Sequence, residues 1–429
     1  MQIISFSVIE LFNSFSYHFE IDEDQKVFML TGPNGYGKTT ILTIINNLSK
    51  LNLEYFYELP FKSIEINFEE EQRLTIESVF FKNEQMNFIV AEDNEVDIEK
   101  EVAFRWFEKK KEITKLVLNK KNLNKAHRSY NYEHYYRESF QLLSNTKEYR
   151  NGNDLMQKYA IIAKEQNQEQ FLLILKSIST LFLPANRIYV NKRNEDKESN
   201  AEVMIYKVAE SLKKKMQETF LNYFRQSDKG SKELIEKLLE SDKKYTREEY
   251  EEKAVSLKNK LIALKSFNLY VDKDIRPYQE DKKQILSVYL DELANKIEVY
   301  TELAKRLTLF SSLLENKKFI NKKVVFNRSS GLRAISNDGS ILELDKLSSG
   351  EQNEIIMLYH FIFEINEGMI VLIDEPENSL HVAWQSMFLN DIKQIAEGID
   401  VQFIIATHSP QLIGNNWDKC FDLYECLEA

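Results

Sequence analysis

Cysteine, proline and glycine are scarce in this chain of 429 residues, which contains 2 Cys, 6 Pro and 11 Gly. The two cysteines, Cys420 and Cys426, form neither a disulfide framework nor a Cys-x-x-Cys metal pair. The shortage of glycine and proline, together with a charged content of 29%, indicates long helices and few loops. A small fold held together by disulfides is therefore excluded.

Long apolar runs and an excess of basic residues are also missing. No apolar stretch approaches the ~20 residues that a membrane helix requires. The N-terminus lacks the basic start and long apolar core of a signal peptide, so we expect a cytoplasmic protein without a membrane contact. The net charge is −11, and any contact with nucleic acid must therefore use a local basic patch.

The most informative stretch is a glycine-rich pattern, G-x-x-x-x-G-K-[ST], between a short apolar run at 26–30 and a helical pattern at 40–48. A strand, a glycine loop and a helix N-terminus place backbone N–H groups around a phosphate. Lys38 is expected to reach the β- and γ-phosphates, and the Thr39 hydroxyl to bind Mg²⁺. The stretch predicts a nucleoside triphosphate site made of Gly32, Pro33, Asn34, Gly35, Tyr36, Gly37, Lys38, Thr39 and Thr40.

Alternation of apolar and polar residues predicts strands within 1–31 and at 61–68, 73–81 and 87–91. The last three are interpreted as an antiparallel layer beside the nucleotide-binding core. Three aromatic residues near the N-terminus, Phe12, Phe15 and Tyr17, are candidates for stacking on an adenine, but packing within a sheet is the favoured interpretation.

The middle of the chain is charged, and from Lys100 to Leu175 its pattern predicts helices. A basic stretch from Lys109 to Arg128, followed by tyrosines, has the composition of a nucleic-acid contact; a solvated helix face is the favoured alternative. A buried strand is expected within 177–190. Residues 194–317 predict a compact helical insertion with one long amphipathic helix at 281–316, followed by short strands at 319–326, 331–336 and 340–344.

Two apolar strands near the C-terminus end in polar side chains. The strand at 369–373 is followed by Asp374, expected to orient Mg²⁺, and by Glu375, expected to polarise a water for attack on the γ-phosphate. The strand at 401–406 leads to His408, interpreted as a γ-phosphate sensor. Between the insertion and these strands, Ser348 and Ser349 are good helix caps before Gly350 and Glu351, although such a sequence caps many helices.

Taken together and in this order, four motifs resemble the ABC-type ATPase heads of the SMC/RecF/OLD class: Gly32 to Thr40, Leu-Ser-Ser-Gly-Glu-Gln352, Ile-Asp-Glu-Pro-Glu-Asn-Ser-Leu-His381 and Thr-His-Ser-Pro410. The resemblance implies an ATP- and Mg²⁺-dependent hydrolase of α/β fold, with a mixed sheet core and an antiparallel β layer. It also implies that two heads dimerise head-to-tail or form a higher homo-oligomer. ATP would lie between the phosphate loop of one chain and the signature residues Ser348, Ser349, Gly350 and Glu351 of the other.

In this resemblance, Lys38 and Thr39 match the Walker A ligands, Asp374 and Glu375 the Walker B pair, and His408 the switch histidine; the loop 378–380 crosses the dimer. Two positions depart from the family pattern. Ser349 replaces the first glycine of the usual signature, and no glutamine follows the strand at 180–183. Asn186 is the nearest substitute as a Mg²⁺ ligand, while Arg187 is an alternative that would act on phosphate.

The insertion is too short for an SMC arm and lacks the Cys-x-x-Cys of a zinc hook, and the chain ends soon after His408, so a Toprim nuclease domain is not expected. This architecture resembles the ATPase subunits of bacterial anti-phage systems such as PARIS and Septu, which work beside a separately encoded nuclease. The alternatives are a RecF-like DNA-repair or DNA-loading ATPase and an oligomeric scaffold that uses ATP with little turnover.

We therefore expect an ATPase head built from 1–99 and 318–429, interrupted by a mainly helical insertion at 100–317 that also contains the head strand near 177–190. The insertion is expected to carry the surface for a partner or for oligomerisation, with DNA or a phage protein as further candidate ligands. The alternative is that the insertion only supports the head.

Overall fold

The chain divides into two units, each assembled from separated stretches of sequence. The computed structural model describes residues 1–22, 24–82, 98–127, 150–190, 202–240, 243–269, 275–378 and 380–425. Unit 1 consists of residues 1–185, 365–377 and 396–429, and unit 2 of residues 186–364 and 378–395. The predicted boundaries of head and insertion stay predictions.

A parallel sheet forms the centre of unit 1. Its strand order is β16 (Cys420–Asp422), β3 (Val27–Thr31), β15 (Val401–Ala406), β14 (Met369–Asp374) and β8 (Thr180–Leu183). Every residue of β3 and β15 is buried, as expected for parallel strands covered on both faces. The register pairs Ala406 with Leu30 on one side and with Asp374 on the other. The carboxyl ends of three central strands therefore finish level at one edge of the sheet.

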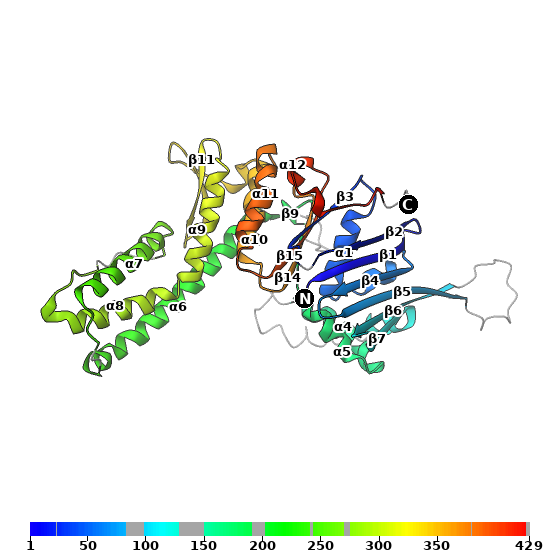
Figure 1. The fold of residues 1–429 in the computed structure, drawn as a ribbon, viewed down its shortest axis with the longest axis horizontal. Coiled ribbons are helices and arrows are strands. Elements are labelled where there is room, and N and C mark those ends of the chain that lie inside the picture. Colours follow the sequence, from blue (N-terminus) through cyan, green and yellow to red (C-terminus); the bar gives the residue numbers. More distant parts are fainter. Residues whose placement is uncertain are drawn as a thin grey trace. The chain divides into compact units, whose positions relative to one another are not determined.

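A second, antiparallel sheet lies in the same unit (Figure 1), and it confirms the predicted β layer. Its order is β2 (Phe15–Glu20), β1 (Ile3–Leu11), β4 (Ser63–Phe68), β5 (Gln72–Lys82), β6 (Ile98–Glu108) and β7 (Lys111–Asn119). Apolar side chains of both sheets and of α1 (Lys38–Ser49) share one buried core, to which Phe6, Phe28 and Ile45 contribute. The other helices of unit 1 are α2 (Glu54–Glu58), α4 (Arg150–Glu165), α5 (Glu169–Ser177), α12 (Pro410–Ile413) and the 3₁₀ turn η4 (Trp417–Lys419). The strand predicted at 87–91 lies outside the described residues.

The helical prediction for the start of the 100–175 stretch is wrong, because β6 and β7 occupy residues 98–119. The buried side chains alternate along β6, where Val102, Phe104 and Trp106 are fully covered. They alternate again along β7, where Leu116 and Leu118 are covered. The dense charge between these positions hides a period of two residues, which is the strand period.

The basic stretch begins at the β6–β7 hairpin. Lys109 and Lys110 occupy its turn with φ values of 45° and 67°, and both are exposed. A hollow at this end of the sheet is lined by Lys109 and Lys111 together with three carboxylates, Glu70, Glu71 and Glu108. Acidic side chains thus offset the lysines here, and a nucleic-acid contact at the hairpin gains no support. Arg128 lies outside the described residues.

Unit 2 contains the predicted helical insertion: α6 (Met204–Glu240), α7 (Arg247–Ser266), η2 (Glu280–Lys282), α8 (Lys283–Glu298) and α9 (Thr301–Asn316). The single helix predicted at 281–316 is wrong, because α8 and α9 are separated at Val299 and Tyr300. No glycine or proline causes this break. Tyr300 is fully buried with its ring 5.2 Å from that of Tyr223 on α6, and the sequence Val299-Tyr300-Thr301 has low helix propensity.

The predicted strands after the insertion are confirmed as a three-stranded antiparallel sheet, β11 (Lys322–Asn327), β12 (Gly331–Ser336) and β13 (Ile341–Leu342). Unit 2 also holds the pair β9 (Tyr189–Val190) and β10 (Glu202–Val203), the turn η3 (Leu344–Lys346), and the helices α10 (Ser349–Phe363) and α11 (Val382–Ile395). Within the described ranges, no helix combines the length and apolar character that a membrane crossing requires.

Helix α6 lies very close to the first residue of β12. Gly331 has a φ of 73°, and a Cβ built on it would lie 1.9 Å from the carbonyl oxygen of Ala209. Gly331→Ala should therefore lower the free energy of unfolding by about 2–4 kcal/mol, the sum of a left-handed alanine and an overpacked contact. Thermal unfolding, with hydrogen exchange along β12, measures the loss.

Gly339→Ala is the matched control. Gly339 also has a positive φ, 88°, but nothing lies within 4 Å of the position of its Cβ. Only the backbone cost of ~1 kcal/mol is expected there. Equal shifts in the two variants would show that the close approach of Ala209 does not constrain β12.

Candidate functional site

Three chain segments meet at the carboxyl edge of the parallel sheet in unit 1. The phosphate-loop sequence follows β3, the two acids Asp374 and Glu375 end β14, and Thr407 and His408 follow β15. Backbone bonds extend the ladder past the strands, because Thr407 N–H donates to Leu30 O (3.0 Å) and Glu375 N–H to Ala406 O (2.9 Å). The structure therefore brings the predicted loop, acids and histidine to the same edge.

The glycine loop adopts a conformation that side chains would disturb. Gly35 and Gly37 have φ values of 87° and 88°, in the left-handed region. Gly35 has no neighbour within 4 Å of its Cβ position, whereas a Cβ on Gly37 would lie 3.3 Å from Leu11. Helix α1 begins directly after Gly37, and no side chain caps it. Its first N–H groups are therefore available to an anion.

Two further contacts hold this loop. The Tyr17 hydroxyl donates to Tyr36 O at 2.8 Å from the neighbouring sheet, so this buried ring has a packing role, as the favoured interpretation of the aromatic residues predicts. The Lys38 ammonium lies inside the loop and donates to Gly32 O (2.7 Å) and Pro33 O (3.0 Å). The positive charge of Lys38 therefore lies inside the loop, at the position expected for a bound phosphate.

Thr39 and Asp374 form the most direct link between the loop and β14. The Thr39 hydroxyl lies 3.0 Å from each carboxylate oxygen of Asp374, whose side chain is buried. A hydroxyl and a carboxylate oxygen are ligands that suit Mg²⁺, which takes one or two protein oxygens together with phosphate oxygens and waters. The pair fits the predicted metal position.

Glu375 is held in a sparsely populated backbone conformation. Its φ is 44°, in the left-handed region that residues other than glycine rarely occupy. The Glu375 side chain is about a quarter exposed. One Glu375 oxygen lies 3.9 Å from Nδ1 of His408. Strain of this kind is often found at functional positions.

The sequence did not predict a role for Glu377, which organises the histidine loop. One oxygen of this buried carboxylate accepts from the Thr407 hydroxyl (2.8 Å) and from the His408 N–H (2.8 Å), and it lies 3.5 Å from the His408 ring nitrogen Nδ1. The signal was present in Pro-Glu-Asn after the two acids, but a turn residue gives no local sign of which neighbouring strand it contacts. After His408, Ser409 caps α12 at Leu412 N, with Pro410 in the first turn.

The predicted signature residues lie in unit 2, at the start of α10. The Ser348 hydroxyl accepts from Glu351 N–H (3.3 Å), and the Glu351 carboxylate accepts from Ser348 N–H (2.8 Å), which is a reciprocal capping box. Lys322 on β11 pairs with the same carboxylate at 2.9 Å. The assignment of Ser348, Ser349, Gly350 and Glu351 to nucleotide binding stays a prediction.

Further along α10, a buried ion cluster ties the helix to its neighbours. The Lys317 ammonium, fully buried, lies 2.7 Å from Glu354 and 2.5 Å from Asp391 on α11. Burial alone would lower the pKa of Lys317, but the two carboxylates together raise it. Burial raises the pKa of both Glu354 and Asp391. Removal of one partner would leave an uncompensated charge buried in the interior. The cluster therefore fixes how α9, α10 and α11 meet.

The remaining candidate, Asn186, is exposed at the beginning of unit 2, and its role as a metal ligand stays a prediction. Its neighbour Arg187 is 3% exposed and lies against α10, with Nη1 3.1 Å from the sulfur of Met357. Arg187 therefore has a packing position inside unit 2, and the alternative that it acts on phosphate gains no support.

Comparison with known proteins identifies the family. The family model described as AAA ATPase domain matches residues 1–413. No curated protein matches the chain. Among solved structures, an Smc head bound to the C-winged helix domain of ScpA is 13% identical, with 97% of this chain and 92% of that chain covered and a TM-score of 0.38.

An Smc head domain with an extended coiled coil, derived from Pyrococcus furiosus and bound to the C-terminal domain of ScpA, is 14% identical, with 96% and 91% covered and a TM-score of 0.36. Both TM-scores are below 0.5, so the assignment rests on the family match. That match confirms the predicted ATPase head, while the narrower likeness to PARIS and Septu stays a prediction. Because the matched region spans nearly all of the sequence, the chain belongs to the AAA ATPase domain family.

Proposed function

We propose that this protein is a Mg²⁺-dependent ATP hydrolase. The observation that supports this most directly is the approach of the Thr39 hydroxyl to Asp374 at 3.0 Å, beside Lys38 and the uncapped start of α1. The loop N–H groups and Lys38 would hold the β- and γ-phosphates, and Thr39 and Asp374 would hold Mg²⁺. The bound metal would neutralise charge that develops on the phosphates.

Glu375 is the proposed general base, and His408 the proposed contact to the γ-phosphate. A carboxylate at the sheet edge can accept a proton from a water that attacks the γ-phosphate. The His408 ring is about half exposed and lies near Glu375, so it is placed to donate a hydrogen bond to a phosphate oxygen. Glu377 would act as a positioning residue, because it fixes the backbone of His408.

The proposed active site is shared between two copies of the chain. Support comes from the ABC-type motif order and from the start of α10, where a capping box presents Ser348 to Gly350 in an ordered turn. In a head-to-tail pair, this turn of one protomer would face the phosphate loop of its partner. The loop 378–380 and Asn186 are further proposed contributors from unit 2.

We also propose that the ATPase cycle regulates a separately encoded effector, such as a nuclease in anti-phage defence. This role is supported by the resemblance of the motif order and of the helical insertion in unit 2. A RecF-like role on DNA and an ATP-stabilised scaffold are the alternatives. A nuclease gene beside this one, with co-purification of its product, would favour the first role. ATP turnover by the purified protein would argue against the scaffold.

Glu375→Gln tests the general base. The amide keeps the shape of the side chain but cannot accept a proton, so kcat should fall by about 100-fold or more while ATP binding persists. Equilibrium binding of a fluorescent ATP analogue and single-turnover hydrolysis separate the two effects. Turnover equal to that of the wild type would remove Glu375 from the mechanism.

Glu377→Ala tests the positioning role. Without an acceptor for the Thr407 hydroxyl and the His408 N–H, the histidine loop should lose its place, and kcat should fall about tenfold, or ~1.4 kcal/mol. ATP affinity should change little, because Glu377 is not proposed to touch the nucleotide. Glu377→Gln retains an acceptor oxygen and should have a higher kcat than Glu377→Ala. If Glu377 had only a structural role, both variants would lose stability equally.

A mixing experiment tests the shared site. Lys38→Ala removes the phosphate contact and Gly350→Asp places a carboxylate at the signature turn, so each variant alone should be inactive. Mixed in equal amounts, the two should form heterodimers with one intact composite site and recover part of the activity. Full ATPase activity from a strictly monomeric protein, or no recovery from a mixture proven to contain heterodimers, would contradict the proposal.

A further inference from the structure

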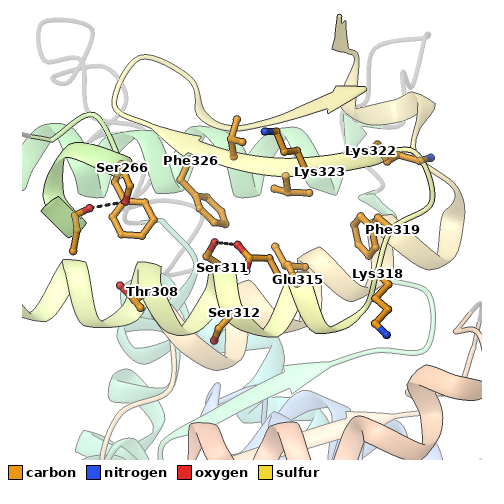
Figure 2. A pocket seen from close by; sticks show the side chains of 15 residues that line it. Ser266, Thr308, Ser311, Ser312, Glu315, Lys318, Phe319, Lys322, Lys323 and Phe326 are labelled. Atoms are coloured by element: carbon orange, nitrogen blue, oxygen red, sulfur yellow. Dashed lines mark hydrogen bonds between the residues drawn. The ribbon is translucent and has the colours of Figure 1, made fainter. Parts of the chain in front are cut away.

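Unit 2 contains a groove that none of the proposed ATPase chemistry uses. It has a volume of about 710 Å³ and lies between β11, helix α9 and the end of α7 (Figure 2). Ser311 and Glu315 of α9 line one wall, and Lys323 and Phe326 of β11 line the other. Its size is that of a site for a ligand or a short chain segment.

The groove runs along the edge of a strand. β11 is the outermost strand of its sheet, which has the order β11-β12-β13. Five consecutive residues, Lys322 to Phe326, line the hollow. Successive side chains of a strand point to opposite faces, so contact with all five places the backbone edge of β11 toward the groove. An exposed strand edge presents N–H and C=O groups that can pair with an added strand.

The charge along this edge is positive. Lys318 and Lys323 are both exposed and line the groove, and within the described parts of the chain neither forms an ion pair with a carboxylate. Lys322 already pairs with Glu351, and Glu315 accepts a hydrogen bond from the Ser311 hydroxyl at 3.1 Å. Two lysines therefore remain available to an incoming segment, in a chain whose net charge is −11.

The lining also offers apolar contacts. Phe267, Phe319 and Phe326 contribute aromatic surface, and Val324 and Val325 lie on the strand itself. A segment in extended conformation presents every second side chain to one face. Alternating acidic and apolar side chains would match both the two lysines and this surface.

We propose that the β11 groove binds an extended acidic segment of a partner protein, which adds as a strand to the free edge of β11. Backbone pairing supplies the affinity, and contacts to Lys318 and Lys323 select acidic side chains. This binding does not depend on nucleotide hydrolysis. The peptide site can therefore be absent while the proposed ATPase function holds, and the ATPase function can be absent while the peptide binds.

Selection from a displayed library of random linear peptides, with the full chain as bait, tests the proposal. The recovered peptides should be acidic with alternating apolar residues, and their binding should weaken as salt is raised. Lys318→Glu combined with Lys323→Glu should weaken the best peptide at least tenfold. Methylation of alternate backbone nitrogens in that peptide should cause a similar loss, because it removes the donors for strand pairing.

The matched control reverses two exposed lysines outside the groove, one on α7 and one on α9. This variant, Lys258→Glu combined with Lys305→Glu, should change the affinity less than twofold. Equal losses in both double variants would reduce the effect to general charge and overturn the site. The proposal also fails if no peptide is recovered, if backbone methylation is harmless, or if a DNA oligonucleotide competes with the peptide. A change of oligomeric state in the groove variant alone would assign the surface to a second copy of this chain instead.

Discussion

The level carboxyl edge of the parallel sheet is the constraint on which the candidate site depends. β3, β14 and β15 are held in register by apolar side chains buried on both faces, and their ends carry the phosphate loop, Asp374 and the histidine loop. A slip of β14 by one residue would displace Asp374 by about 3.3 Å and reverse its face, which would break its contact with Thr39. The geometry of the site is therefore a consequence of burial in the sheet.

A different force organises helix α10 in unit 2. There a single ammonium, that of Lys317, compensates two buried carboxylates on α10 and α11. A cluster of this kind contributes little net stability compared with apolar packing, but a misplaced partner is costly. It therefore specifies one arrangement of three helices. The capping box at Ser348 then sets the turn that begins α10.

Much of the site could be predicted because its signals are local. The loop at 32–40 and the acids at 374 and 375 each lie beside the strand that positions them. Glu377 could not be found in this way, since its partners Thr407 and His408 lie on another strand. Its acceptor role becomes visible only when the register of β14 and β15 is known.

Predictions of the fold failed where charge or tertiary packing masked a pattern. The lysines and glutamates of 98–119 concealed a strand alternation that Phe104, Trp106 and Leu116 carry. The break at Tyr300 depends on burial against Tyr223, which no helical periodicity reveals. The β11 groove is lined by residues of α7, α9 and β11. These segments come together only in the folded unit, so the sequence pattern does not reveal the groove.

The place of β3 in its sheet also bears on how the chain reaches its native state. Its two neighbours, β15 and β16, come from residues 401–406 and 420–422, near the other end of the sequence. During synthesis both edges of β3, which leads into the phosphate loop, therefore stay unpaired until residues 401–422 have left the ribosome. Such long-range pairing makes folding slow and exposes apolar strand edges to aggregation. Early capture by a chaperone would protect the nascent nucleotide site at this stage.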